Sequence, residues 1–269
     1  MQTRLCLSCV AALGLWLGVA CSSKDESKTV SASSAQPDAG APTRALDLAE
    51  VTAHPERFTW FDFRPDVKKL ILAGAPETEH IAILWYTAAD GGVGLHYHAK
   101  TESVYVIDGT QTDAKGDYPS GAVYFNPPGS GHQITHSTGF FLLAYAAAPE
   151  FSGTERIREY TPVRMDLAAE DLSGRYAFTE KSKGVRTHEV PLAAEGGMHA
   201  ELIELEADAS HTYSGNYLLV LSGACSIAGA TRAAKQLVVT QAVAPHAYEL
   251  AAAESGKCVL LGMTFDAAH

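Results

Sequence analysis

Short apolar or alternating segments recur along the chain from about Phe58 onward, separated by Gly, Pro, Asp and Asn. Examples are "HIAILWYTA", "SVYVIDG" and "FFLLAYAAA", followed later by "AELIELEA", "YLLVLSGA" and "CVLLGMTF". Apolar runs of this length, with turn residues between them, are typical of strands rather than helices. The pattern predicts an all-β protein made of sandwiches or barrels. The best helical candidate is "MDLAAEDLSG" at residues 165–174, where we expect a linker between two halves of the chain.

The two halves of the chain repeat each other. "ESVYVIDG" ends at Gly109 and "NYLLVLSG" ends at Gly223, and His132 and His246 each lie 23 residues beyond their glycine. Equal spacing of this kind indicates duplication followed by divergence, and it predicts two β-domains of one architecture. The predicted domains are residues 46–160 and residues 161–269.

The N-terminus has the features of an export signal. It reads "MQTRLCLSCVAALGLWLGVACSS", with Arg4 before an apolar run and small residues up to Cys21. The run is shorter than the roughly 20 residues of a spanning helix, which favours a signal peptide at residues 1–21. "LGVAC" resembles a bacterial lipobox. This resemblance implies lipidation of Cys21, and Ser22 after it favours an outer-membrane lipoprotein facing the periplasm or the cell surface. An ordinary secretory signal is the alternative.

Composition separates a tether from a folded body. Residues 22–45 are mostly Ser, Ala, Asp and Pro, which predicts a flexible segment. The whole chain has 20 Lys and Arg against 31 Asp and Glu, and it has no basic cluster, which argues against nucleic acid as a partner. Processing would leave Cys225 and Cys258 in an oxidising compartment, either as a disulfide or as two buried apolar side chains.

The segment "GLHYHAKTESVYVIDG", residues 94–109, carries the candidate chemistry. His96 and His98 point to the same face of a strand, and Glu102 has the same parity if the segment stays extended, so we expect three ligands from one strand. His132 follows a rigid Pro-Pro-Gly turn, and a neighbouring strand would bring it to the other three. Three imidazoles and a carboxylate suit one divalent ion, zinc or iron, with manganese or nickel as alternatives.

These residues resemble the two sequence motifs of the cupins. Two positions depart from the motifs: Gly91 comes one place late after Asp90, and His136 stands in place of the final Asn. The resemblance implies an all-β fold of two cupin jelly-roll β-barrels in tandem, with a metal inside the first. The matching positions are His96, His98, Glu102 and Gly109 in G-x5-H-x-H-x3-E-x6-G, and Gly121, Pro127, Gly129 and His132 in G-x5-P-x-G-x2-H-x3-N.

The short connection between the two motifs and the phrase "GDYPSGAVYFNPPGSGH" resemble in particular the ChrR-like cupins, over roughly residues 55–150. That group includes the zinc-binding domain of an anti-sigma factor, and related iron barrels are diketone or aryl-ketone dioxygenases. The resemblance leaves two functions open. One is a metal-dependent dioxygenase or hydrolytic cupin acting on a small organic molecule, and the other is a non-catalytic zinc-binding cupin that senses or binds a ligand.

The coordination number of the ion would decide between these two functions. Four ligands leave two positions on an octahedral ion and none on tetrahedral zinc. The sequence assigns no catalytic residue. Because cupins often associate through sheet edges, a homodimer is a further expectation. The candidates for the cavity wall are His136, Trp85, Tyr86, Phe125 and Phe141.

The second half lacks most of the candidate ligands. Asn216 occupies the place of Glu102, and "SHTYSG" precedes it in place of the two histidines. Only His246 keeps the position of a ligand. Since one ligand cannot hold a metal, we expect the second barrel to be structural.

Overall fold

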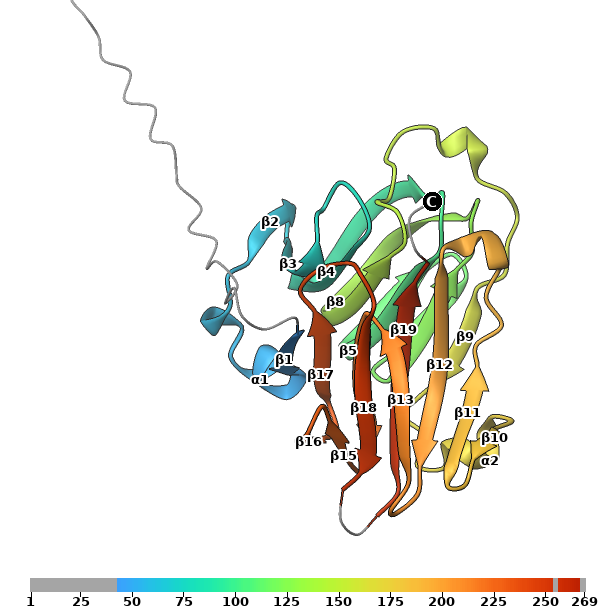
Figure 1. The fold of residues 1–269 in the computed structure, drawn as a ribbon. Coiled ribbons are helices and arrows are strands. Elements are labelled where there is room, and N and C mark those ends of the chain that lie inside the picture. Colours follow the sequence, from blue (N-terminus) through green and yellow to red (C-terminus); the bar gives the residue numbers. More distant parts are fainter. Residues whose placement is uncertain (1–42, 254–255, 267–269) are drawn as a thin grey trace, which may run out of the picture. The chain divides into compact units, whose positions relative to one another are not determined.

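The computed structural model describes residues 43–253 and 256–266, and it is shown in Figure 1. The predicted signal peptide, Cys21 and most of the predicted tether lie outside these residues and stay predictions. Among the helices of the described ranges, none has the length and the apolar character needed to cross a membrane.

Strands joined by short turns make up most of the described chain, as the alternating pattern predicts. The strands of the first half are β1 (Thr43–Asp47), β2 (Phe61–Arg64), β3 (Val67–Gly74), β4 (His80–Tyr97), β5 (Glu102–Asp113), β6 (Gly116–Pro119), β7 (Ala122–Asn126) and β8 (Gly131–Tyr145). The strands of the second half are β9 (Val163–Asp166), β10 (Thr179–Ser182), β11 (Val185–Glu189), β12 (Met198–Leu205), β13 (Ser210–Gly215), β14 (Tyr217–Ser222), β15 (Ala224–Ile227), β16 (Ala230–Ala233), β17 (Gln236–Thr240), β18 (His246–Ala252) and β19 (Cys258–Phe265).

The strands form three antiparallel sheets. One sheet has the order β2-β3-β4-β8-β5-β7-β9, with β6 paired to β5, and it makes the first barrel. The other two have the orders β1-β17-β14-β19-β12-β11-β10 and β13-β18-β15-β16, and they make the second. The ladder between the long strands β4 and β8 shifts register three times. Such bulges bend a strand, which lets β4 and β8 curve around the barrel interior. The prediction of two tandem cupin barrels is confirmed.

The two halves exchange strands at their edges. β1 pairs with β17 of the second half, with Leu46 opposite Leu237. β9 pairs with β7 of the first half, with Met165 opposite Val123. Residues 43–45, which the composition assigned to the tether, are therefore part of a strand. The domain limit between residues 160 and 161 stays a prediction, although β9 beyond it completes the sheet of the first barrel.

Three clusters of buried apolar side chains form the core. The largest contains residues of both halves, among them Phe125 and Leu202, and it joins the barrels. The two others fill the barrel interiors. Along β5, Val104 and Val106 lie in the interior cluster of the first barrel, whereas Ile107 lies in the joining cluster. Because both faces of β5 are buried at these positions, its sequence is a nearly continuous apolar run there.

The helix expected at residues 165–174 is mostly wrong. Met165 belongs to β9, where it is buried against the first barrel, and only the turn α2 (Leu172–Arg175) is helical. Tertiary strand pairing overrides the weak helical pattern here. The longest described helix is instead α1 (Leu48–Ala53), in which the Asp47 side chain accepts a hydrogen bond of 2.8 Å from the Ala49 N–H. Three 3-10 turns complete the fold: η1 (Pro55–Arg57), η2 (Thr154–Arg156) and η3 (Ala194–Gly196).

Cys225 and Cys258 form a disulfide inside the second barrel, with their Cα atoms 5.7 Å apart. Both residues are fully buried in the interior cluster of that barrel. The structure thus decides between the two alternatives that the sequence left open.

Removing this disulfide is expected to lower the free energy of unfolding by about 3.5 kcal/mol, because the bond restricts a long loop of the unfolded chain. The sequence separation is 33 residues. The measurement is denaturant unfolding of Cys225→Ala/Cys258→Ala beside the oxidised wild type. Reduced wild type is the control and should lose a similar amount. Equal stability of the oxidised wild type and the double variant would contradict this expectation.

Candidate metal centre

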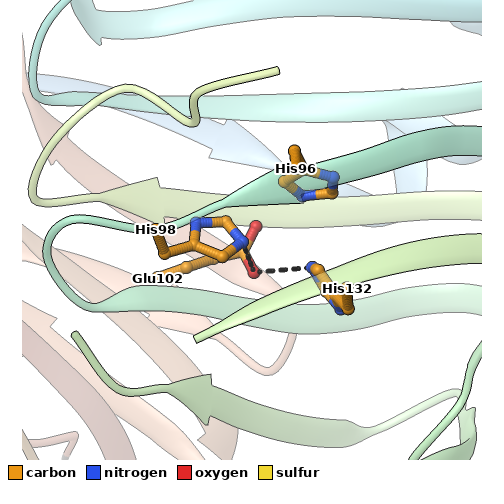
Figure 2. Close-up of side chains that lie close together, drawn as sticks. All are labelled: His96, His98, Glu102 and His132. Atoms are coloured by element: carbon orange, nitrogen blue, oxygen red, sulfur yellow. Dashed lines mark ion pairs between the residues drawn. The ribbon is translucent and has the colours of Figure 1, made fainter. Parts of the chain in front are cut away.

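Three histidines and one glutamate converge inside the first barrel, as Figure 2 shows. His96 lies near the end of β4, His98 follows that strand, Glu102 is the first residue of β5, and His132 lies on β8. All four side chains are buried, and their candidate ligand atoms lie within 4.8 Å of one another. The structure thus brings together the four residues that the sequence predicts as metal ligands.

The expectation of three ligands from one strand is wrong. β4 ends at Tyr97 and β5 begins at Glu102, so the chain turns between the histidine pair and the glutamate. The turn is held by the second motif, because the His98 N–H donates to Ser130 O at 2.9 Å and the Gly129 N–H donates to His98 O at 2.8 Å. The Pro-Pro-Gly turn therefore fixes the position of His98.

Antiparallel pairing places His132 directly opposite His96 in the β4–β8 ladder. The neighbouring Gly131 permits this close approach. A Cβ atom at that position would lie 2.5 Å from the His96 carbonyl oxygen, a distance at which the backbone would have to move. The position of His132 thus depends on a residue without a side chain beside it.

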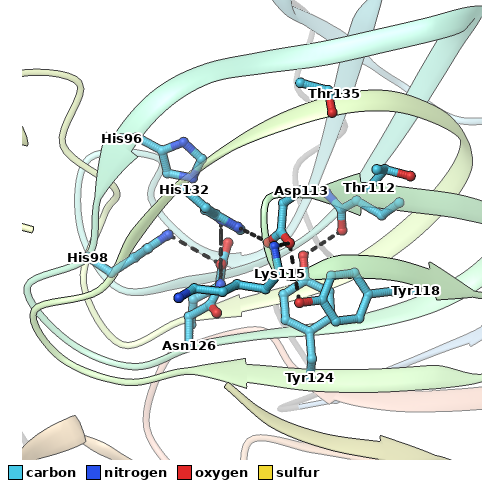
Figure 3. Close-up of polar contacts among 12 residues, drawn as sticks. His96, His98, Thr112, Asp113, Lys115, Tyr118, Tyr124, Asn126, His132 and Thr135 are labelled. Carbon is cyan, nitrogen blue, oxygen red and sulfur yellow. Dashed lines mark hydrogen bonds and ion pairs between the residues drawn. The ribbon is translucent and has the colours of Figure 1, made fainter. Parts of the chain in front are cut away.

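Hydrogen bonds orient the ligands, as Figure 3 shows for His132. His132 Nδ1 lies 2.8 Å from an Asp113 carboxylate oxygen, and His96 Nδ1 lies 2.8 Å from the Gly94 carbonyl oxygen. These contacts assign the Nδ1 proton and direct Nε2 of each ring to the centre. The Asn126 amide donates to Glu102 Oε2 at 2.8 Å.

The donor set fits a metal ion. Within the described residues, neither ring nitrogen of the fully buried His98 has a hydrogen-bond partner. A buried polar atom without a partner is costly, and coordination would remove that cost at one nitrogen. Imidazole and carboxylate ligands suit several divalent ions, so the site suits a metal ion without selecting one.

Charge at the site also favours a cation. Burial lowers the pKa of His96 to about 4 and that of His98 to about 3, so both rings are neutral at pH 7. Burial would raise the pKa of Glu102, but the neighbouring His98 and His132 hold it well below its usual range. Burial would lower the pKa of His132, but hydrogen bonds to Asp113 and Glu102 outweigh this and raise it to about 9.

A small cavity of about 10 Å³ adjoins the cluster, which is room for about one water molecule. Phe63 and Phe151 lie on one side of it with ring centroids 6.3 Å apart, and the Arg64 guanidinium carbon lies 4.2 Å from the Phe151 centroid. The remaining wall is mostly apolar, with Tyr86 and Gln111 as polar members. The other lining residues are Leu84, Val93, Ile134, Leu143, Tyr145 and Pro149.

Of the five predicted wall residues, only Tyr86 lines this cavity. Phe141 is buried in the barrel interior behind Tyr86, with ring centroids 5.2 Å apart. Trp85 and Phe125 have the opposite strand parity and pack in the cluster that joins the halves. The assignments of Trp85 and Phe125 are wrong because sequence spacing did not show which parity faces inward. Phe141 has the inward parity but does not reach the cavity.

His136 is also placed outside the cavity. Its side chain is 74% exposed and forms an ion pair with Asp90. Strand parity from His132 would point it inward, but its φ of 50° breaks the regular strand. The left-handed backbone turns the side chain to the surface. The departure from the motif at this position therefore adds no ligand.

Sequence reasoning missed Asp113 and Asn126, which support His132 and Glu102. Both are buried, and they are the last residues of β5 and β7. A sequence signal for Asp113 was present in "DGTQTD", because Gln111 and Asp113 are two residues apart and therefore share one face of a strand. In the structure Tyr124 donates to Gln111 Oε1 at 2.7 Å, and Tyr118 lies 3.4 Å from the Asp113 carboxylate. These contacts extend the polar network behind His132 (Figure 3).

The second barrel lacks the segment that carries His98 in the first. Gly215 lies opposite His246 in the β13–β18 ladder, as His96 lies opposite His132. Asn216 follows Gly215 directly, so the turn corresponding to residues 97–101 is missing. Asn216 Oδ1 accepts a hydrogen bond of 2.7 Å from the Phe265 N–H and thus holds the backbone. In the part of the chain that the structure describes, the first barrel holds the one candidate metal cluster.

A β-barrel with three inward histidines and a glutamate is the arrangement that the resemblance to the cupin motifs implies. Residues 48–148 match the family model of the ChrR Cupin-like domain. The matched segment includes all four residues of the cluster. No curated protein matches the sequence.

Solved structures of other proteins resemble the chain in fold. Salicylate 1,2-dioxygenase from Pseudoaminobacter salicylatoxidans, solved as adducts with gentisate, is 13% identical, with 86% of this chain and 87% of that chain covered and a TM-score of 0.54. A cupin 2 conserved barrel domain protein from Leptotrichia buccalis is 13% identical, with 83% and 96% covered and a TM-score of 0.53. At these identities the similarity shows the fold alone.

Replacing Asp113 by Asn is expected to weaken metal binding by about 10- to 100-fold, as the loss of an outer partner of a ligating histidine does. The change removes the carboxylate that holds His132 Nδ1. Competition with a chelator measures the affinity. Asp108→Asn is the matched control, because Asp108 is exposed on the same strand. The role of Asp113 is refuted if both variants bind metal equally tightly.

Proposed function

We propose that the protein is a metal-dependent cupin enzyme of the bacterial cell envelope, of the dioxygenase or hydrolytic type, that acts on a small organic molecule. The observation that carries this proposal is the asymmetry of the site. Ligands and their hydrogen-bond partners cover one side of the cluster, and an apolar, aromatic pocket adjoins the other. Apolar pockets with a few polar groups are typical of small-molecule sites.

The chain's own residues have separate roles in this proposal. His96, His98, Glu102 and His132 would hold the ion, which as a Lewis acid polarises an oxygen of the bound molecule. Phe63 and Phe151 exclude water from the pocket. Such a pocket strengthens electrostatic interactions with the substrate.

Tyr86 is the polar group that orients the substrate. Its hydroxyl lies 3.5 Å from the Gln111 amide nitrogen. Burial raises the pKa of Tyr86, so the phenol stays protonated and donates a hydrogen bond. Gln111 is in turn fixed by Tyr124 at 2.7 Å. A carbonyl or hydroxyl oxygen of the substrate would be positioned by this fixed donor.

A second candidate function is a non-catalytic zinc-binding cupin with a sensing or ligand-binding role. The small cavity of about 10 Å³ favours it, because four protein ligands complete tetrahedral zinc without a substrate. In the enzyme proposal, Phe63 and Phe151 must separate to admit a substrate.

Elemental analysis of protein purified without added metal tests the two candidates. An iron, manganese or nickel content of one ion per chain supports the enzyme proposal. The second measurement is of turnover. Oxygen consumption is measured after iron loading with a panel of diketones and catechol-like compounds, and hydrolysis is measured with ester substrates. Turnover that is lost in His98→Ala supports the proposal. Stoichiometric zinc together with no turnover of any substrate would overturn it and favour the second candidate.

The cellular location is part of the proposal and rests on the sequence. "LGVAC" supports lipid attachment at Cys21, with the folded body exported. Metabolic labelling with a palmitate analogue, followed by membrane fractionation, tests this. Label in the wild type and its loss in Cys21→Ser are expected. Unlabelled protein in a soluble fraction would contradict lipid anchoring.

A further inference from the structure

A second cavity lies in the second barrel, apart from the metal cluster. Its volume is about 460 Å³, which is within the range of small-molecule sites. It opens between the edge strand β13 and the sheet face formed by β10, β11, β12 and β19. The barrel that the sequence suggests to be only structural thus contains the larger cavity of the two.

The second barrel lacks the turn that carries His98 in the first, and Tyr213 packs over two glycines. A Cβ atom at Gly215 would lie 2.3 Å from the Tyr213 ring, and one at Gly262 would lie 2.6 Å from it. The Tyr213 hydroxyl, 3.1 Å from Thr264 Oγ1, forms part of the cavity wall.

The charges of the cavity favour a cation. Glu189 and Glu201 line it together with one ammonium group, Lys181, and two imidazoles, His199 and His211, of which His199 pairs with Asp266. Among the described residues, Glu189, Glu201 and Lys181 take part in no ion pair. Burial raises the pKa of Glu201, Lys181 opposes this and Glu189 adds to it. Glu189 and Glu201 lie directly opposite each other in the β11–β12 ladder, where two carboxylates repel each other, and a cationic ligand would relieve that repulsion.

The remaining wall is rich in hydroxyl groups. Thr187, Tyr213 and Thr264 contribute them, and Thr187 and Tyr213 are buried. A hydroxyl both donates and accepts hydrogen bonds, so a ligand with several hydroxyls can satisfy this wall. The Tyr213 ring gives the cavity one aromatic surface. Large aliphatic side chains, which would favour an apolar ligand, do not line the cavity.

We propose that the second barrel binds a small hydroxylated molecule that carries one ammonium group. The ammonium group lies at Glu189 and Glu201, and the ligand hydroxyls contact Thr187 and Tyr213. An amino sugar has this chemistry. The site does not depend on the metal of the first barrel, so the test below is independent of the proposed enzyme function.

Calorimetric titration of the full chain with three hexoses of different charge tests the proposal. The probes are D-glucosamine, D-glucose and D-glucuronate, which are cationic, neutral and anionic at neutral pH. We expect saturable binding of glucosamine, binding of glucose weaker by about tenfold, and no binding of glucuronate. The tenfold ratio of affinities is what one hydrogen bond to a charged group provides.

Substitutions that change the charge in opposite directions complete the test. Glu201→Gln should weaken glucosamine binding about tenfold, and Lys181→Gln should strengthen it. Glu206→Gln is the matched control, because Glu206 is exposed in the turn after β12 and does not line the cavity. Metal content and thermal unfolding of each variant show that the first barrel and the fold are intact. Equal binding of the three hexoses, no saturable binding of glucosamine, or equal effects of Glu201→Gln and Glu206→Gln would overturn the proposal.

Discussion

Replacing His98 by Ala is expected to abolish metal binding at working concentrations. The affinity should fall by more than the roughly 100-fold that the loss of an outer hydrogen bond causes, because a direct ligand is removed. His98 is the most buried of the histidines in the cluster, with 1% of its side chain exposed, so water cannot easily replace its imidazole. Elemental analysis after desalting measures the bound metal.

The same variant should lose the stabilisation that metal provides. A ligand present at about 1,000 times its dissociation constant stabilises the folded state by about 4.1 kcal/mol. This increment should be present in the wild type and absent in His98→Ala. The metal-free variant should still fold, because the two unpartnered ring nitrogens disappear together with the imidazole. His136→Ala is the control, since His136 is exposed, and it should keep both metal and stabilisation. Full metal occupancy in His98→Ala would refute the ligand set.

Metal affinity is expected to rise with pH by about tenfold per unit between about pH 6 and pH 9 and then to level off. The reason is His132, whose pKa is raised to about 9 by Asp113 and Glu102 against the opposing effect of burial. A metal ion must displace this proton from Nε2. His96 and His98 add no slope in this range, because their pKa values of about 4 and about 3 leave them neutral.

Titration with Co²⁺ against a competing chelator at fixed ionic strength measures the pH dependence. Asp113→Asn should shift the plateau to lower pH, because it removes one partner of the His132 imidazolium. In the metal-free protein, by contrast, the contribution of His132 to the free energy of unfolding falls as pH rises. The folded-state pKa of His132 lies above its unfolded value of 6.5, so its contribution is complete below that value and is lost as pH rises through about 9. An affinity that is independent of pH over this range would contradict the assignment.

The ligand set could be predicted from sequence because two short motifs fix it locally. The spacing of His96, His98 and Glu102 around one turn, and of His132 after Pro-Pro-Gly, is a property of neighbouring residues. The walls of the pocket were predicted less well. Whether Trp85 or Tyr86 faces the cavity depends on the strand register. Bulges in β4 and β8 shift this register, and a shift of one residue exchanges the two faces of a strand.

The position of the His136 side chain also could not be predicted from strand parity. Continuing the parity of His132 puts this residue in the cavity, and one left-handed position moves it to the surface. The residues 165–174 show the same limit for secondary structure. A weak helical pattern gave way to a strand because β7 offers an edge for Met165 to pair with.

The sequence by itself determined the strand pattern, the duplication, the four candidate ligands and their loss in the second half, because each is recorded in local spacing. Tertiary structure decided the pairing of Cys225 with Cys258, the support of His132 by Asp113, the exchange of β1 and β9 between the halves, and the open polar cavity at Glu201. Each of these depends on residues far apart in the chain. Their contacts are set by strand order and register, which no local spacing encodes.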